Sequence, residues 1–174
     1  NNNNNNNGGS SEKILLVLTK GCGITTSNAI GALRHFRCEP EPRSLLDVLQ
    51  DADGTDQLMD VHRSVAGSDG VGADDEDDVD DDVDVDDGYV LVTGEDTVRG
   101  MHLAGLDTVV VVGRANGPDE YVHIAGRTGR AGKPGKVLNV LSEPNQVSAV
   151  KAWETILRAD FRSINMEDVA AGRL

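Results

Sequence analysis

The chain has 174 residues, carries a formal net charge of −14 and is 38% hydrophobic. This length suits a single domain with its own hydrophobic core. Most of the negative charge lies in residues 74–87, which contain 11 acidic and no basic residues, whereas residues 88–174 contain 10 of each kind. The acidic composition therefore does not exclude a nucleic-acid partner. No apolar run is long enough to cross a membrane, so we expect no membrane association.

Residues 1–12 begin with seven asparagines, followed by glycines and serines. This low-complexity composition predicts a linker before the folded domain, which we place at residues 13–158, with residues 159–174 as a C-terminal extension. Cys22 and Cys38 are the only cysteines, so the sequence lacks a disulfide framework and a paired-cysteine metal site. We therefore expect an intracellular protein of the nucleolus, the cytoplasm or the mitochondrion, with preference for the mitochondrion.

The first half of the chain alternates apolar runs with helical patterns. Residues 13–19 form a continuous apolar run, which predicts a strand buried on both faces of a parallel sheet. A helix follows, and three hydroxyl residues can cap it: Thr25, Thr26 or Ser27. Its apolar face, which we expect in the core, consists of Ile30, Leu33 and Phe36. Residues 45–49 are interpreted as a second strand, and the apolar stripe of residues 56–65 predicts an amphipathic helix.

The second half of the chain predicts three more buried strands, at residues 89–93, 107–112 and 137–141. A short helix is expected at residues 118–126. A final helix, capped by Ser142 with Pro144 in its first turn, carries an apolar stripe that consists of Val147, Val150, Trp153, Ile156 and Leu157. Strands that alternate with helices predict an α/β fold with a parallel sheet, whose ligands bind at the carboxyl ends of the strands. We expect Thr19, Thr93 and the loop that carries Arg127 to meet there.

That loop has an unusual spacing of glycines and bases. From Gly126 to Gly135 every third residue is glycine, and a base follows each one: Arg127, Arg130, Lys133 and Lys136. Glycine lets the backbone approach a ligand closely, and two arginines three residues apart can place planar charged groups on one anion. A phosphoryl group in transfer is an anion that such groups stabilise well. The pattern therefore predicts a phosphate-binding loop.

Two other glycine-rich structures do not fit the sequence of this loop. The four Gly-x-y triplets are too few for a collagen helix and are flanked by apolar strands. A Walker loop would need an earlier glycine and a serine or threonine after Lys133 or Lys136, and both are absent. A flexible basic turn without a ligand stays open on composition alone.

Residues 123–130, His-Ile-Ala-Gly-Arg-Thr-Gly-Arg, resemble the sixth conserved motif of DEAD-box RNA helicases, His-Arg-x-Gly-Arg-Thr-Gly-Arg, at every position except Ile124. Residues 91–102 resemble the fifth motif, and residues 14–19 resemble the fourth. From residue 13 to about residue 157, the order of elements resembles the second, C-terminal RecA-like domain of such a helicase. The resemblance implies an α/β, RecA-like fold in which helices sandwich a parallel sheet, with residues 74–87 as a disordered acidic insertion.

The resemblance also implies which residues are functional. Arg127 and Arg130 match catalytic arginines that reach the γ-phosphate of ATP, and Arg130 matches the arginine finger. The implied ATP-binding or interdomain residues are His123, Gly126, Arg99, Gly100 and His102. The implied RNA-binding residues are Thr19, Lys20 and Gly94. In such helicases ATP and Mg²⁺ are bound mainly by a first RecA-like domain, and no metal ligand is expected in this chain. The expected partners are therefore the RNA backbone, a first RecA-like domain and ribosomal or other ribonucleoprotein proteins.

Several residues depart from the family pattern at functional positions. His102 stands where an aspartate binds the ribose hydroxyls, Gly94 stands where a threonine contacts RNA, and Ile124 replaces an arginine of the sixth motif. The helix-borne arginine between the fourth and fifth motifs is not found, and the chain has neither a Walker A lysine nor Walker B carboxylates. We therefore expect RNA-stimulated ATP hydrolysis only together with a first RecA-like domain.

Two hypotheses follow. In the first, the chain is the finger-bearing half of an ATP-dependent RNA helicase, with RNA remodelling or ribosome and ribonucleoprotein assembly as its role by analogy. In the second, it is a degenerate and inactive helicase-like domain, retained as a structural RNA-binding component of a ribonucleoprotein such as a ribosome or an assembly intermediate. Arg127 and Arg130 favour the first hypothesis, whereas His102, Gly94 and Ile124 favour the second.

Overall fold

A computed structural model describes residues 12–50, 88–99, 103, 105–130, 132–165, 167 and 169. The helix predicted at residues 56–65, the acidic insertion predicted at residues 74–87, and the candidate site residues Gly100 and His102 lie outside the described residues.

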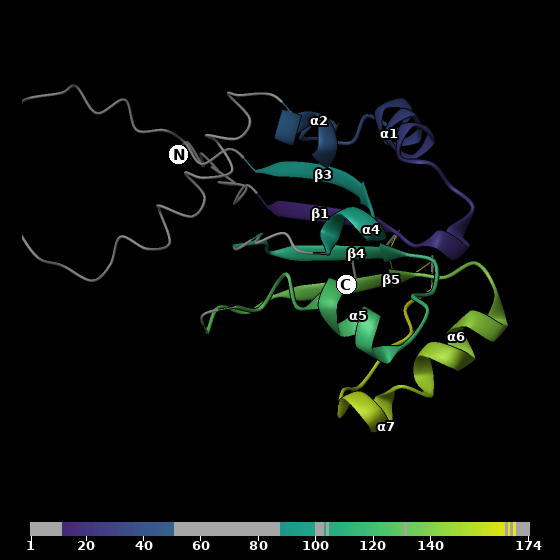
Figure 1. Ribbon diagram of the computed structural model, residues 1–174. Helices are drawn as coiled ribbons and strands as arrows, with labels where there is room; N and C mark the ends of the chain where they lie inside the picture. The colour runs from purple at the N-terminus through teal and green to yellow at the C-terminus, as the bar shows by residue number, and fades with distance from the viewer. Residues whose placement is uncertain are drawn as a thin grey trace, which may run out of the picture.

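The described residues form a five-stranded, fully parallel sheet flanked by helices (Figure 1). The strands are β1 (Lys13–Leu18), β2 (Pro42–Ser44), β3 (Tyr89–Gly94), β4 (Thr108–Val112) and β5 (Lys136–Val140), and their order across the sheet is β2-β3-β1-β4-β5. The helices are η1 (Lys20–Cys22), α1 (Thr26–His35), α2 (Leu45–Gln50), α4 (Glu95–Val98), α5 (Pro118–Ala125), α6 (Pro144–Lys151) and α7 (Glu154–Leu157). This architecture confirms the predicted α/β fold and the four strands predicted from continuous apolar runs.

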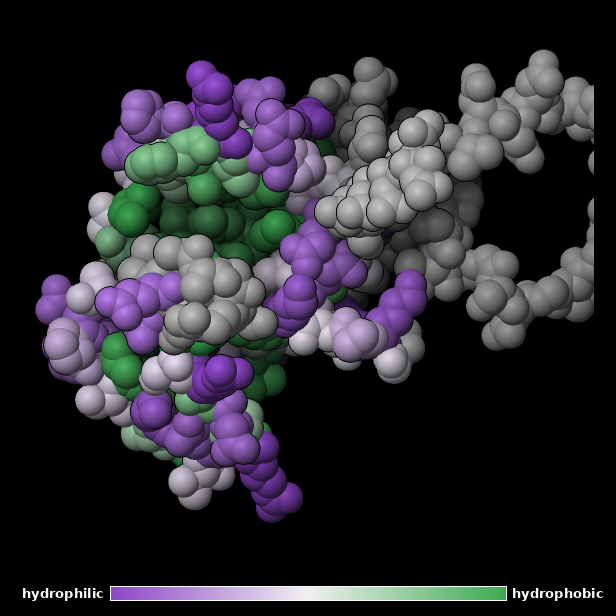
Figure 2. Space-filling view, turned by 180° about the vertical axis from the view of Figure 1, so that it is seen from behind, coloured by the Kyte–Doolittle hydropathy of each residue, from purple (hydrophilic) through white to green (hydrophobic). Residues whose placement is uncertain are grey.

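The core lies between the sheet and the helices α4 and α5, which cover one of its faces (Figure 1), and residues of α2 and α6 also belong to it. Successive strand residues point to opposite faces, so Leu15 and Val17 of β1 enter this core and are fully buried. The opposite face carries one row of neighbours, Leu16, Val110 and Leu138, that are only partly buried. Seen from that side, polar residues border a hollow in which hydrophobic residues are visible (Figure 2). No helix among the described residues is long and apolar enough to cross a membrane.

The strand predicted at residues 45–49 is wrong, because these residues form the helix α2, and the strand β2 lies just before it. Leu45 and Val48, three residues apart, are buried on one side of the helix, whereas Leu46 is 49% exposed. An apolar run of this length fits a buried strand and a buried helical turn equally well. The packing of α2 against β2 and β3 decides in favour of the helix.

Two expectations about core residues are also wrong. The apolar face predicted for α1 is not in the core, because no residue of this helix is buried and Ile30 and Leu33 are only partly buried. Phe36 is 80% exposed because α1 ends at His35, so that Phe36 leaves the helix at its C-cap. The final helix is two helices separated by a turn at residues 152 and 153, and this change of direction leaves Ile156 66% exposed. Val150 and Trp153 are buried as predicted. The residue before α6 is Glu143 rather than the predicted Ser142 cap, although Pro144 does occupy the first turn.

Candidate functional site

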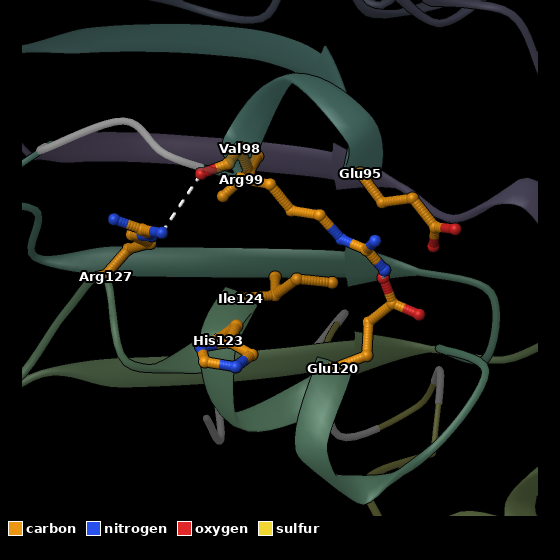
Figure 3. A pocket seen from close by; sticks show the side chains of 7 residues that line it. All are labelled: Glu95, Val98, Arg99, Glu120, His123, Ile124 and Arg127. Atoms are coloured by element: carbon orange, nitrogen blue, oxygen red, sulfur yellow. Dashed lines mark hydrogen bonds and ion pairs between the residues drawn. The ribbon is translucent and has the colours of Figure 1, made fainter.

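A small pocket lies between α4 and α5 (Figure 3). The residues that line it are Glu95, Val98, Arg99, Glu120, His123, Ile124 and Arg127. Three of them, Arg99, His123 and Arg127, are residues that the sequence assigned to ATP binding or catalysis. The structure therefore brings these three positions together although they come from different elements.

Local sequence features explain how α5 begins and ends at this pocket. Pro118 occupies its first turn, and Glu120 lies near the positive N-terminal end of the helix. The helix is capped by Gly126, where an added Cβ would approach the carbonyl oxygen of Val122 to 2.8 Å. That close approach requires glycine at this position. The chain turns again at Gly129, whose φ of 67° also favours glycine.

Arg127 follows this cap and turns back toward α4. Its Nη2 donates a hydrogen bond of 3.0 Å to the carbonyl oxygen of Val98, and the residue is 8% exposed (Figure 3). Burial, and after it the nearby positive charge of Arg130, lowers the pKa of Arg127. The guanidinium is thus partly engaged within the domain, where it ties the end of α5 to the end of α4.

Arg130 lies in a different environment at the surface of the same loop. Its Nε donates a hydrogen bond of 2.6 Å to the carbonyl oxygen of Gly126, and the residue is exposed. Within the part of the chain that the structure describes, its terminal Nη groups make no hydrogen bond or ion pair. The guanidinium is therefore oriented by the loop while its two outer nitrogens can still bind an anion.

Arg99 ends α4 and forms an ion pair with Glu120 of α5 (Figure 3). The hydrogen bond from Arg99 lowers the pKa of Glu120 and raises that of Arg99 itself. The two side chains differ in burial: that of Arg99 is 60% exposed, whereas that of Glu120 is 10% exposed. Asn116 also hydrogen-bonds to Glu120. Arg99 thus neutralises a largely buried carboxylate, and its charge is shared with that partner.

Glu95, the first residue of α4, is 2% exposed, and neither of its carboxylate oxygens accepts a hydrogen bond from a described residue. Burial raises the pKa of Glu95 above its ordinary value of 4.5. The facing backbone N–H of Lys20 lowers this pKa without offsetting the effect of burial. Among the described residues, no group of three or more histidine, cysteine, aspartate or glutamate side chains could hold a metal ion.

The predicted RNA-binding residues lie at the carboxyl ends of β1 and β3. Thr19 is 3% exposed, and both its N–H and its Oγ1 donate to the carbonyl oxygen of Val112, at 3.0 and 2.9 Å. Lys20 is exposed, and its Nζ lies 2.9 Å from Oδ1 of Asp96. Gly94 pairs with Leu18 at the end of β3 and precedes α4. Of this set, Lys20 and Gly94 are accessible, whereas the hydroxyl of Thr19 is engaged inside the sheet.

The expected convergence of Thr19, Thr93 and the basic loop at the carboxyl edge is wrong. α5 starts at that edge and runs back along the sheet, so its eight residues carry the chain about 12 Å toward the amino ends of the strands. Thr128 therefore forms an isolated β-bridge with Leu106, just before β4 begins. Its Oγ1 also donates a hydrogen bond of 2.5 Å to the carbonyl oxygen of Leu106. The arginine loop and the edge that carries Lys20 are separated by the length of the helix.

The sequence did not assign a role to the two carboxylates of the pocket. Glu95 lies within the fifth-motif resemblance, but its burial depends on how α4 packs against β1 and β3. Glu120 lies in the first turn of the helix predicted at residues 118–126. Its partner Arg99 is 21 residues away, and no local pattern predicts that pair. Ile124, which replaces an arginine of the family motif, is 3% exposed and belongs to the core.

No family model matches the sequence, and no curated protein matches it. The structure is similar to that of the C-terminal domain of the DEAD-box protein Dbp5, with 16% identity, a TM-score of 0.51, and coverage of 84% of this chain and 71% of that one. It is also similar to S. cerevisiae Dbp5 bound to RNA and ADP BeF3, with 14% identity, a TM-score of 0.49, and coverage of 94% of this chain and 44% of that one. The described residues therefore have the RecA-like fold of the C-terminal domain of a DEAD-box protein.

Proposed function

We propose that the chain is the second, C-terminal RecA-like domain of an ATP-dependent RNA helicase. It supplies an arginine finger and contacts to the RNA backbone, and it acts in RNA remodelling or in the assembly of ribosomes or other ribonucleoproteins. The proposal rests mainly on the exposure and orientation of the Arg130 side chain. This arginine is exposed, is oriented by the Gly126 carbonyl group, and lies in the loop that follows α5 on a RecA-like fold.

The chemistry of the arginines suits a transferred phosphoryl group. Negative charge spreads over the phosphoryl oxygens in the transition state, and a planar guanidinium stabilises it with two donors at once. Arg130 has both outer nitrogens available for this role. Arg127 is buried and donates to Val98, so we propose that it holds the loop in place and shares the phosphate only at its exposed side. ATP, which supplies the phosphoryl group when bound, and Mg²⁺ are held mainly by a first RecA-like domain.

The RNA contacts are proposed for the carboxyl edge of β1 and β3. Lys20 presents an exposed ammonium group there, and Gly94 leaves its backbone accessible. Because the hydroxyl of Thr19 donates to Val112, we propose that Thr19 fixes the start of the loop that presents Lys20. Contacts of this kind recognise phosphates rather than bases, so the RNA is bound without strong sequence preference.

The second candidate function is that of an inactive RNA-binding domain within a ribonucleoprotein. Two observations favour it. Ile124 fills core space where the family motif has an arginine, and Arg99 is paired with a buried carboxylate rather than left for a nucleotide. The two functions are separated by RNA-stimulated ATP turnover of this chain together with a first RecA-like domain. Turnover that depends on Arg130 supports the helicase, whereas RNA binding without any such turnover supports the structural component.

A further inference from the structure

Asp96 and Lys20 form the contact on which this inference rests. Nζ of Lys20 lies 2.9 Å from Oδ1 of Asp96, and the side chains are 59% and 67% exposed. Lys20 follows β1, and Asp96 lies in the first turn of α4, directly after β3. The pair therefore sits at the carboxyl edge where we placed the RNA backbone, and it involves the one lysine assigned to that contact.

The ion pair between Arg99 and Glu120 cannot exchange its partner as easily, because its carboxylate is buried. Glu120 is 10% exposed, so withdrawing Arg99 would leave a carboxylate in an apolar environment without its cation. Asp96, in contrast, becomes fully hydrated when Lys20 leaves it, and an exposed pair of this kind contributes little to stability. The Lys20–Asp96 pair is thus the exchangeable one, and an incoming phosphate can replace the carboxylate on Lys20 at small cost.

The charged groups around Lys20 affect how strongly it can bind RNA phosphate. The nearby charged groups are the acids Glu95 and Asp96 and the base Arg99. Asp96 contributes to this edge in two ways, because it occupies the ammonium group of Lys20 and it repels each phosphate that approaches. Screening by salt weakens both effects, since both side chains are exposed.

We propose that Asp96 is an affinity-determining residue, a resident carboxylate that competes with RNA phosphate for Lys20 and so keeps RNA binding at this edge weak and readily reversible. The ligand is the phosphate backbone of single-stranded RNA, and the inference rests on the proposed function through its RNA contact at Lys20.

The experiment measures binding of a short fluorescein-labelled oligouridylate to the 174-residue chain by fluorescence anisotropy at several salt concentrations. Asp96→Asn should tighten binding roughly two- to five-fold at low salt, and the gain should shrink as salt rises. Asp119→Asn is the matched control. Asp119 is also an exposed aspartate in the first turn of a helix, and its replacement changes the net charge by the same amount.

Lys20→Ala completes a double-mutant cycle. It should weaken binding and lower the magnitude of the salt slope by about 0.7, the value for one phosphate contact on a single strand. In the Lys20→Ala background, the gain from Asp96→Asn should be clearly smaller, because only the direct repulsion between Asp96 and phosphate remains to be removed. A gain of the same size in both backgrounds, or one that Asp119→Asn reproduces, overturns the inference as a general charge effect.

The cycle also separates this inference from the proposed function. If Lys20→Ala weakens binding while Asp96→Asn changes nothing, the RNA contact stands and competition by Asp96 is overturned. If Lys20→Ala leaves binding unchanged, the RNA contact at Lys20 itself is wrong and the inference fails with it. Far-UV circular dichroism of each variant verifies that the fold is retained.

Discussion

Arg99 and Glu120 form an ion pair that joins the end of α4 to the first turn of α5 across the pocket (Figure 3). The pair is asymmetric, because the carboxylate is 10% exposed and the guanidinium 60% exposed. Removing the acid therefore releases an exposed cation into water, whereas removing the base leaves a buried anion. The two substitutions should not be equivalent.

Arg99→Ala should lower the thermal midpoint more than Glu120→Gln does, because only the first leaves a buried charge without its partner. We expect a decrease of roughly 3–6 °C for Arg99→Ala. Arg34→Ala is a suitable control, since Arg34 pairs with Glu41 and both side chains are more than half exposed. Thermal unfolding followed by circular dichroism measures the three variants. Equal decreases for Arg99→Ala and Arg34→Ala would contradict the role assigned to the buried carboxylate.

Glu95 and Glu120 should respond to pH with opposite signs. Burial raises the pKa of Glu95, so its contribution to stability is present at low pH and is lost as pH rises through its folded pKa. Arg99 lowers the pKa of Glu120, so its contribution is present above about 4.5, the ordinary value, and is lost as pH falls through its folded pKa. The two glutamates are thus matched probes of one pocket.

Glu95→Gln should therefore stabilise the chain by about 1–3 kcal/mol near neutral pH, because it removes a buried charge without hydrogen-bond partners. Glu120→Gln should destabilise it under the same conditions. Both differences from the parent chain should disappear in acid, where the parent carboxyl groups are protonated. Urea unfolding at a series of pH values measures the free energies, and a stabilisation by Glu95→Gln that stays constant down to acid pH would rule out the raised pKa as its cause.

Arg130→Ala tests the arginine finger in a protein that joins this chain to a first RecA-like domain. RNA-stimulated turnover should fall on the order of 10³-fold or more, as for other arginine fingers. ATP affinity should fall far less, because the finger acts mainly on charge that develops in the transition state. Arg130→Lys should not restore turnover, since an ammonium group lacks the planar fork.

Lys133→Ala provides the control for Arg130→Ala, because Lys133 is an exposed base of the same loop. RNA-stimulated ATP turnover of the Lys133→Ala variant should stay near that of the parent protein. Unchanged turnover in Arg130→Ala would favour the structural function, and in that case any effect of the substitution should be confined to stability or RNA binding.

The 174-residue chain by itself should show no ATPase activity, with or without RNA, because it has no Walker A lysine and no Walker B carboxylates. RNA binding by this chain should be weak, independent of sequence and strongly dependent on salt. A coupled ATPase assay and anisotropy titrations at two salt concentrations measure these properties. A dissociation constant that does not change with salt would contradict binding through phosphates.

The sequence by itself determined the buried strands of the parallel sheet and the place of the arginine loop along the chain. Buried strands of such a sheet appear as continuous apolar runs, and residues 13–19 and 107–112 therefore predicted β1 and β4 to within one residue. The arginine loop could also be located from its glycines. An added Cβ at Gly126 would come too close to the backbone, and Gly129 has a positive φ, so both positions favour glycine. The apolar run at residues 45–49 was too short to distinguish a strand from a helix. Only the packing of α2 against β2 and β3 shows that these residues are helical.

The tertiary structure alone decided which functional groups meet. Arg127 donates to Val98, 29 residues away, and the hydroxyl of Thr19 donates to Val112, 93 residues away. Such contacts depend on the order of the strands and on the length of α5, which sets how far the arginine loop returns along the sheet. Local sequence fixes each side chain and its element, but the distance between two side chains is a property of the packed layers. For this reason the pairing of Lys20 with Asp96 could be found only in the folded chain.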